Sequence, residues 1–117
     1  MKILIVDDEP LIRQSLRRVA EMHGHEIFEA KDGSQGLEIW RKEDPDLIFL
    51  DVLMPGLSGP QVMKEVGPAH RAKVVLISAY SGEYNLDTAK SIGADMFIPK
   101  PFEDIFSTFE AVEKSCL

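Results

Sequence analysis

The sequence begins with Lys2-Ile-Leu-Ile-Val-Asp-Asp-Glu-Pro10, and this stretch decides the fold. Its first part is short, apolar and rich in β-branched residues, which predicts a buried strand from Lys2 to Val6. The acidic residues that follow mark the carboxyl end of that strand. Pro10 is well tolerated in the first turn of a helix and Gly24 is a typical helix end, so a helix is predicted between them.

The same order of strand and helix repeats along the rest of the chain. Short apolar runs predict further strands at His25–Ala30, Asp46–Asp51, Lys73–Ser78 and Asp95–Pro99. The helices predicted after them run from an N-cap at Ser34 to Lys42, from Gly59 to about Val66, from Tyr84 to Ile92 and from Glu103 to Lys114. Five strands that alternate with five helices predict an α/β fold, in which a parallel sheet is covered on both faces.

The composition indicates one folded domain over residues 1–117. With 44% hydrophobic and 28% charged residues, the chain has enough apolar surface to fold alone. Its net charge of -7 argues against direct nucleic acid binding, because phosphate contacts require a basic face. The single cysteine, Cys116, excludes an internal disulfide and a Cys-rich zinc site.

The chain shows no targeting signal that we recognise. Its first apolar run, Ile3 to Val6, is too short for a signal-peptide core or a membrane span, and acidic residues follow it at once. We therefore expect a cytoplasmic protein with no contact with the membrane.

Polar side chains stand at the ends of four predicted strands. Asp7 and Asp8 follow the first strand, Asp51 ends the third, Ser78 ends the fourth and Lys100 follows the fifth. Ligands of open parallel sheets bind outside the carboxyl ends of the strands. Each residue taken alone is typical of a helix cap, a turn or the solvated surface. Their coincidence at four strand ends predicts a site instead.

The chemistry of these residues favours a phosphoryl group. Neighbouring carboxylates repel and raise each other's pKa, and a hard cation such as Mg²⁺ relieves that repulsion. Lys100 and Ser78 can contact phosphoryl oxygens, and a carboxylate such as Asp51 can act as a nucleophile that forms aspartyl phosphate. Glu9 is either a neighbour of the metal site or a charge at a helix N-terminus.

The chain resembles the receiver domain of bacterial two-component response regulators over nearly its whole length. The motifs that carry the resemblance are Ile5-Val-Asp-Asp-Glu-Pro10, Asp51-Val-Leu-Met-Pro-Gly-Leu-Ser-Gly59, Leu76-Ile-Ser-Ala79 and Gly93-Ala-Asp-Met-Phe-Ile-Pro-Lys-Pro-Phe102. The resemblance implies a flavodoxin-like (βα)5 three-layer sandwich with a five-stranded parallel sheet of order 2-1-3-4-5.

The resemblance also implies a phosphoacceptor site. Asp51 would accept a phosphoryl group from a phosphohistidine on a sensor histidine kinase or phosphotransfer protein. Asp8, Asp51 and the backbone carbonyl of Leu53 would bind Mg²⁺, and Asp7 would act through a metal-bound water. Lys100 would contact the phosphoryl group.

A conformational switch is implied as well. Ser78 would move to hydrogen-bond the phosphoryl group, and Phe97 would turn inward into the space that it leaves. This change would bias the face made by the fourth helix, the fifth strand and the fifth helix, to which a downstream protein would bind. The Lys100–Pro101 bond is usually cis in this family. We also hypothesise that Leu53 and Tyr80 shield the phosphoryl group from water.

The resemblance leaves the output of the domain open. The downstream partner is either a separate protein or a fused output domain, and the acidic last helix favours a monomer or a weak dimer. On this reading the chain is not a turnover enzyme. The alternative is a phosphatase with an aspartyl-phosphate intermediate, but such enzymes carry Asp-x-Asp, whereas Asp7 and Asp8 are adjacent. A flavin carrier would need a Ser/Thr/Gly-rich loop after the first strand, and the full residue set argues against a receiver that no longer accepts phosphate.

Overall fold

The computed structural model describes residues 1–79 and 85–116, in which strands and helices alternate strictly. The strands are β1 (Lys2–Val6), β2 (Glu26–Ala30), β3 (Leu47–Asp51), β4 (Lys73–Ser78) and β5 (Met96–Pro99). The helices are α1 (Pro10–Met22), α2 (Gly33–Glu43), α3 (Gly59–Val66), α4 (Leu86–Ser91) and α5 (Ile105–Cys116).

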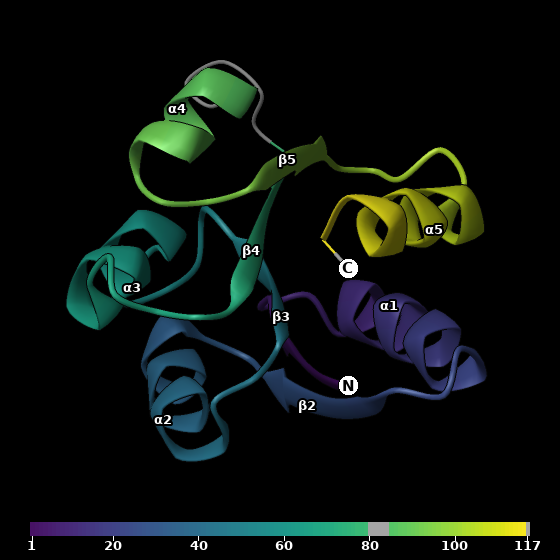
Figure 1. The fold of residues 1–117 in the computed structure, drawn as a ribbon, viewed down its shortest axis with the longest axis horizontal. Helices are drawn as coiled ribbons and strands as arrows, with labels where there is room; N and C mark the ends of the chain where they lie inside the picture. The colour runs from purple at the N-terminus through teal and green to yellow at the C-terminus, as the bar shows by residue number, and fades with distance from the viewer. Residues whose placement is uncertain (80–84, 117) are drawn as a thin grey trace.

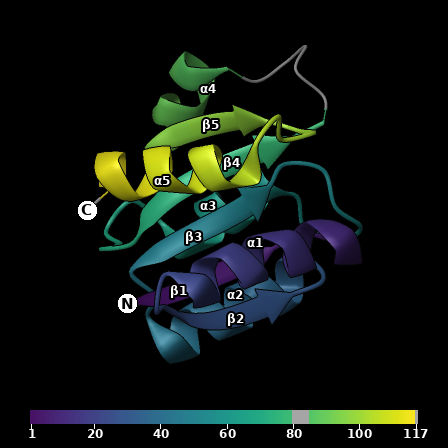
Figure 2. The same ribbon diagram turned by 90° about the vertical axis from the view of Figure 1, so that its right-hand side faces the viewer.

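The strands form one parallel sheet in the order β2-β1-β3-β4-β5. Helices α2, α3 and α4 lie on one face of this sheet and α1 and α5 lie on the other, as the end-on view in Figure 1 shows. In Figure 2 the layer of α1 and α5 faces the viewer. The predicted three-layer α/β sandwich and its strand order are therefore confirmed.

Alternation along the strands divides the core into two layers. Leu4 and Val6 point to the layer under α2, α3 and α4, whereas Ile3 and Ile5 point to the layer under α1 and α5. All four are fully buried. In the second layer Phe109 of α5 stacks on Phe49 of β3, with ring centroids 6.0 Å apart. Both faces of the central strands are thus apolar, and polar side chains concentrate at their ends.

Three helices have bounds that differ from the sequence predictions. The N-cap of α2 is Asp32 rather than Ser34, because the Asp32 side chain accepts a hydrogen bond of 2.8 Å from the Gln35 backbone N–H. Helix α4 spans Leu86–Ser91, and the start predicted at Tyr84 lies outside the described residues. Helix α5 spans Ile105–Cys116, two residues later at each end than predicted.

Two histidines fasten α5 to the turn between α1 and β2. His23 Nδ1 lies 2.6 Å from Glu113 Oε1, and His25 Nε2 lies 2.9 Å from Glu113 Oε2. Burial raises the pKa of Glu113, but the hydrogen bonds with His25 and His23 outweigh it and leave this pKa lowered. The sequence places these residues far apart, and only the packing of α5 beside α1 brings them together.

Candidate functional site

The predicted residues meet at the carboxyl edge of the sheet. Asp7 directly follows β1, Asp51 ends β3, Ser78 ends β4 and Lys100 directly follows β5. Strands β1, β3, β4 and β5 are neighbours in that order, so these four side chains lie along one edge. All four are buried, with exposed fractions of 0%, 3%, 1% and 9% respectively. Such burial of charged residues requires that they be paired.

Lys100 neutralises part of the negative charge at this edge. Its Nζ lies 3.0 Å from Asp7 Oδ2, 3.0 Å from Glu9 Oε1 and 3.4 Å from Asp51 Oδ2. The backbone N–H of Lys100 donates to the carbonyl oxygen of Ser78 at 2.8 Å, which fixes the start of this segment against β4. One ammonium group is therefore shared by three carboxylates, and negative charge remains in excess.

Asp7, Asp8 and Asp51 could hold a metal ion together. Each offers a carboxylate oxygen, and these oxygens lie within 4.8 Å of one another. Asp8 is exposed, so the cluster opens to solvent on one side. Three carboxylate oxygens at this spacing are the donor set that a hard divalent cation prefers. The residues present therefore fit a metal of the magnesium class.

The electrostatics of the cluster show why a cation fits. Burial and the charge of Asp7 raise the pKa of Asp51 to about 7, and the charge and hydrogen bond of Lys100 oppose this rise only in part. Burial also raises the pKa of Asp7, against a hydrogen bond from the Glu9 backbone N–H and the contact with Lys100. The pKa of Lys100 is raised, since its carboxylate partners outweigh its own burial. Without a cation, this edge resists the loss of its protons.

This resistance predicts a pH dependence of stability in EDTA. The folded pKa of Asp51 is raised, so its contribution to folding is present near pH 4 and is lost as the pH rises through about 7. We expect the free energy of unfolding of the wild type to fall, relative to Asp51→Asn, by about 1–3 kcal/mol between pH 5 and pH 8. Urea unfolding in EDTA measures this difference. A difference that does not change with pH would contradict the raised pKa.

A pocket of about 310 Å³ lies beside Asp51 at the carboxyl ends of β1, β3, β4 and β5. Asp8, Glu9, Asp51, Leu53, Ser78, Ala79 and Lys100 line it. Leu53 is 61% exposed and stands at the rim. Phe97 does not line this pocket; it is half-buried and packs on the core layer under α2, α3 and α4. Tyr80 lies outside the described residues. The structure thus brings together all the residues predicted to bind the metal or contact the phosphoryl group, whereas Phe97 packs against the core outside the pocket.

The turn after Asp51 depends on a glycine. A Cβ on Gly59 would lie 2.5 Å from the backbone oxygen of Asp51, so only glycine allows α3 to begin this close to the site. Ser58 caps α3 and forms a capping box with Gln61. The Lys100–Pro101 bond is cis, as the family resemblance implies.

Two contacts at the site were missed by the sequence analysis. Glu9 is the N-cap residue of α1, but its side chain makes no capping hydrogen bond and pairs with Lys100 instead. Arg13, one turn further along α1, donates from Nη1 to the backbone oxygen of Asp7 at 2.7 Å and also pairs with Glu29 of β2. Arg13 lies one helical turn from the acidic triplet, which is a usable signal for a residue that faces it.

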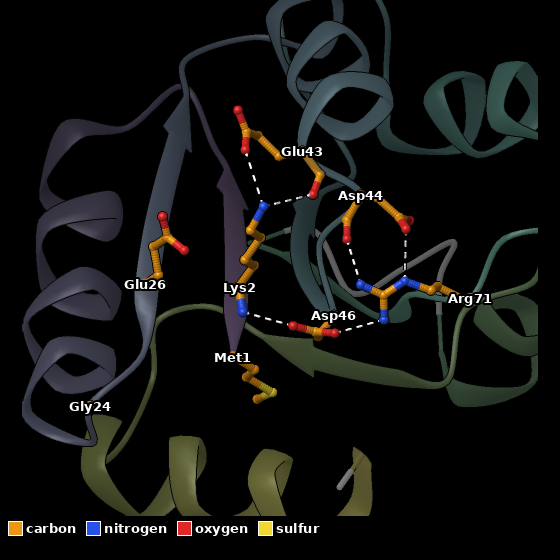
Figure 3. Close-up of a pocket in the computed structure, with 8 residues that line it drawn as sticks. All are labelled: Met1, Lys2, Gly24, Glu26, Glu43, Asp44, Asp46 and Arg71. Atoms are coloured by element: carbon orange, nitrogen blue, oxygen red, sulfur yellow. Dashed lines mark hydrogen bonds and ion pairs between the residues drawn. The ribbon is translucent and has the colours of Figure 1, made fainter.

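A second hollow lies at the opposite edge of the sheet. Figure 3 shows its charged side chains, which pair mainly with one another: Arg71 with Asp44 and Asp46, and Lys2 with Glu43. Because these charges satisfy each other at an exposed rim, they hold loops together and offer little to a ligand. No helix in the part of the chain that the structure describes is long and apolar enough to cross a membrane.

Comparisons with known proteins agree with this geometry. The family model of the response regulator receiver domain matches residues 3–108. Sporulation initiation phosphotransferase F of Bacillus subtilis is 38% identical over 114 residues, which cover 97% of this chain and 91% of that protein. The transcriptional regulatory protein CpxR of Escherichia coli is 35% identical over 103 residues, which cover 88% of this chain and 44% of that protein. The chain thus spans less than half the length of some curated relatives.

Solved structures give the same result. The response regulator TrrA of Thermotoga maritima, in complex with Mg(2+)-BeF, has a TM-score of 0.84 and 35% identity, with 99% of this chain and 98% of that chain covered. The chemotaxis protein CheY4 of Vibrio cholerae has a TM-score of 0.85 and 26% identity, with 97% of each chain covered. These matches do not favour the phosphatase alternative. The chain belongs to the family of response regulator receiver domains, which serve phosphorelay signalling in two-component systems.

Proposed function

We propose that residues 1–117 form one receiver domain that accepts a phosphoryl group on Asp51. The observation that carries the proposal is the position of Asp51: it is buried, lines the pocket at a strand end, and has Lys100 Nζ 3.4 Å away. The same carboxylate belongs to the acidic cluster that fits a divalent cation. A nucleophile, an ammonium group and a cation site therefore share one small pocket.

The transfer uses these residues in distinct roles. A carboxylate oxygen of Asp51 forms the new O–P bond while the N–P bond of a phosphohistidine breaks, and the electron pair of that bond stays on the imidazole nitrogen. Lys100 neutralises charge on the phosphoryl oxygens, and Ser78 hydrogen-bonds one of them after transfer. Burial and the neighbouring charge of Asp7 raise the pKa of Asp51, and a bound cation would favour its ionised, nucleophilic form.

Mg²⁺ is the proposed cofactor. Asp8, Asp51 and the backbone carbonyl of Leu53 would hold it directly, and Asp7 would hold one of its waters. When bound, it neutralises the negative charge that gathers between Asp51 and the incoming phosphoryl group. TrrA, which shares this fold at 35% identity, was crystallised with Mg(2+)-BeF, and this supports the same class of cation here.

The output of the domain is proposed to be a conformational switch. Ser78 moves toward the phosphoryl group and Phe97, now packed on the core layer, turns into the vacated space. The face of α4, β5 and α5 then changes its affinity for a downstream protein or a fused output domain. The phosphoryl donor is a sensor histidine kinase or a phosphotransfer protein in the cytoplasm, and the domain itself is not a turnover enzyme.

Chemical trapping of the acyl phosphate tests the proposal. The protein is incubated with acetyl phosphate and Mg²⁺, reduced with borohydride, digested and mapped by mass spectrometry. We expect Asp51 to be converted to homoserine, because borohydride reduces an acyl phosphate but not a free carboxylate, and we expect no conversion in EDTA. Homoserine at Asp8 or at another carboxylate would move the acceptor elsewhere. If no residue is converted, although Mg²⁺ binding is confirmed by calorimetry, phosphoryl acceptance from this donor is refuted.

Leu53 provides a test of the lifetime of the phosphoryl group. Its side chain is exposed and lines the same pocket as Asp51, and we propose that it shields the phosphoryl group from water. Replacing it with asparagine gives an attacking water a polar partner, so we expect Leu53→Asn to speed dephosphorylation by about tenfold. Loss of phosphorylated protein over time, followed by intact mass, measures the rate. Leu11→Asn, at an exposed leucine of α1, is the control and should leave the rate unchanged.

A further inference from the structure

A groove of about 580 Å³ lies between α3 and α4, away from the acidic pocket. One wall is a stripe of α3: Pro60, Met63 and Lys64 lie on one face of the helix, and the C-cap residue Gly67 continues the spacing i, i+3, i+4, i+7. Helix α3 packs closely on α2, and this stripe faces away from that contact toward α4. Met63 is buried in the core, Pro60 and Gly67 are half-buried and Lys64 is exposed, so the stripe forms a partly exposed rim beside the hollow.

The other wall is the end of α4 and the turn into β5. Ile92 is half-buried there, and Gly93 adopts φ 96°, so no side chain fills the space in front of it. Met63 Cε lies 3.4 Å from where a Cβ of Gly93 would stand, which shows how near the two walls come at the floor of the groove. Apolar atoms form this floor, and a partner's apolar side chain would be shielded from water on it.

The charges around the groove are of one sign. Lys64 and Lys90 stand on opposite walls, both are exposed, and neither forms an ion pair with any residue of 1–79 or 85–116. Among the described residues that line the groove there is no carboxylate. Three further hollows of the described surface each contain at least one acidic side chain. On a chain of net charge -7, an apolar floor between two lysines is a local exception.

We propose that this groove docks an acidic amphipathic helix of a partner protein. Its apolar side chains would rest on Pro60 and Ile92, which are half-buried at the groove, and its carboxylates would pair with Lys64 and Lys90. Docking of a helix in a groove uses this combination of an apolar stripe and flanking charges. The surrounding acidic surface repels acidic segments in general. Only a segment that also buries apolar side chains on the floor of the groove gains enough binding free energy to outweigh this repulsion. The groove lies on the side of α4 that faces α3, so it shares α4 with the α4-β5-α5 face.

Nuclear magnetic resonance with a model peptide tests this inference. The probe is a 14-residue capped peptide of leucine and glutamate at helical spacing, and its counterpart carries lysine in place of glutamate. We expect the glutamate peptide to shift the amide signals of Gly67 and Gly93 in a saturable manner and to leave Gly24, at the far turn, unchanged. The lysine peptide should shift neither signal.

Charge reversal supplies a matched pair of variants. Lys64→Glu with Lys90→Glu should weaken binding by about tenfold or more, because two attractions become repulsions. Lys42→Glu with Lys114→Glu makes the same change in the last turns of α2 and α5 and should stay within about twofold of the wild type. Absence of shifts at millimolar glutamate peptide, equal shifts with the lysine peptide, or equal loss in both variants would overturn the proposal. Concentration-dependent shifts without peptide would assign the groove to a second copy instead.

Discussion

Asp51→Asn is expected to abolish phosphoryl acceptance, with a fall in rate of about 10³-fold or more. Asparagine keeps the shape of the side chain but presents an amide oxygen, which is a poor nucleophile toward phosphorus. Of the acidic residues described as lining the pocket, Asp8 and Glu9 are exposed and only Asp51 is buried, so no other carboxylate takes its place there. The measurement is incorporation of phosphoryl groups from acetyl phosphate with Mg²⁺, followed by intact mass.

The stability of this variant separates loss of chemistry from loss of fold. Burial and the charge of Asp7 raise the pKa of Asp51 to about 7, so replacing Asp51 by a neutral residue relieves its repulsion with Asp7. In EDTA at pH 8 we therefore expect Asp51→Asn to be more stable than the wild type while it is inactive. Asp87→Asn, at an exposed position of α4, should leave both properties unchanged. Undiminished incorporation in Asp51→Asn would place the acceptor at another residue.

The main features of the site could be predicted because they depend on the ends of strands. Once the apolar runs are located, the backbone of a parallel sheet carries Asp7, Asp51, Ser78 and Lys100 to the same edge whatever their side-chain conformations. That is why residues up to 93 positions apart, such as Asp7 and Lys100, could be grouped before any contact was known.

The features that could not be predicted depend on side-chain direction and on the placement of helices. Both roles left open for Glu9 suited its position in the sequence, and only its conformation shows that it pairs with Lys100. Asp32 and Ser34 are both good cap residues, and the extended backbone at Asp32 decides between them. The groove beside Lys64 and Lys90 depends on how α3 lies between α2 and α4, which no local pattern encodes.

Lys100→Met should produce the largest change in stability of the substitutions considered. Methionine keeps an unbranched apolar stem but removes the ammonium group that Asp7 and Asp51 share. Removing one partner of a buried ion pair leaves an uncompensated charge and costs about 3–5 kcal/mol. We expect a loss of this size in EDTA at pH 8, measured by urea unfolding. Lys42→Met, at an exposed position of α2, is the matched control and should change stability little.

The pH and metal dependence of this loss identifies its cause. Asp7 and Asp51 have raised pKa values and gain protons as the pH falls, so at pH 5 they need the ammonium less and the loss should shrink by about half. Mg²⁺ at pH 8 should restore part of the stability, because a cation bound to the same carboxylates neutralises the negative charge that Lys100 no longer balances. A loss that is equal at both pH values and unaffected by Mg²⁺ would mean that Lys100 stabilises the fold through packing of its stem alone. The predicted pattern would instead mean that Lys100 and the metal each neutralise part of the negative charge at one acidic edge. That edge can then receive the additional negative charge of the phosphoryl group only when both cations are present.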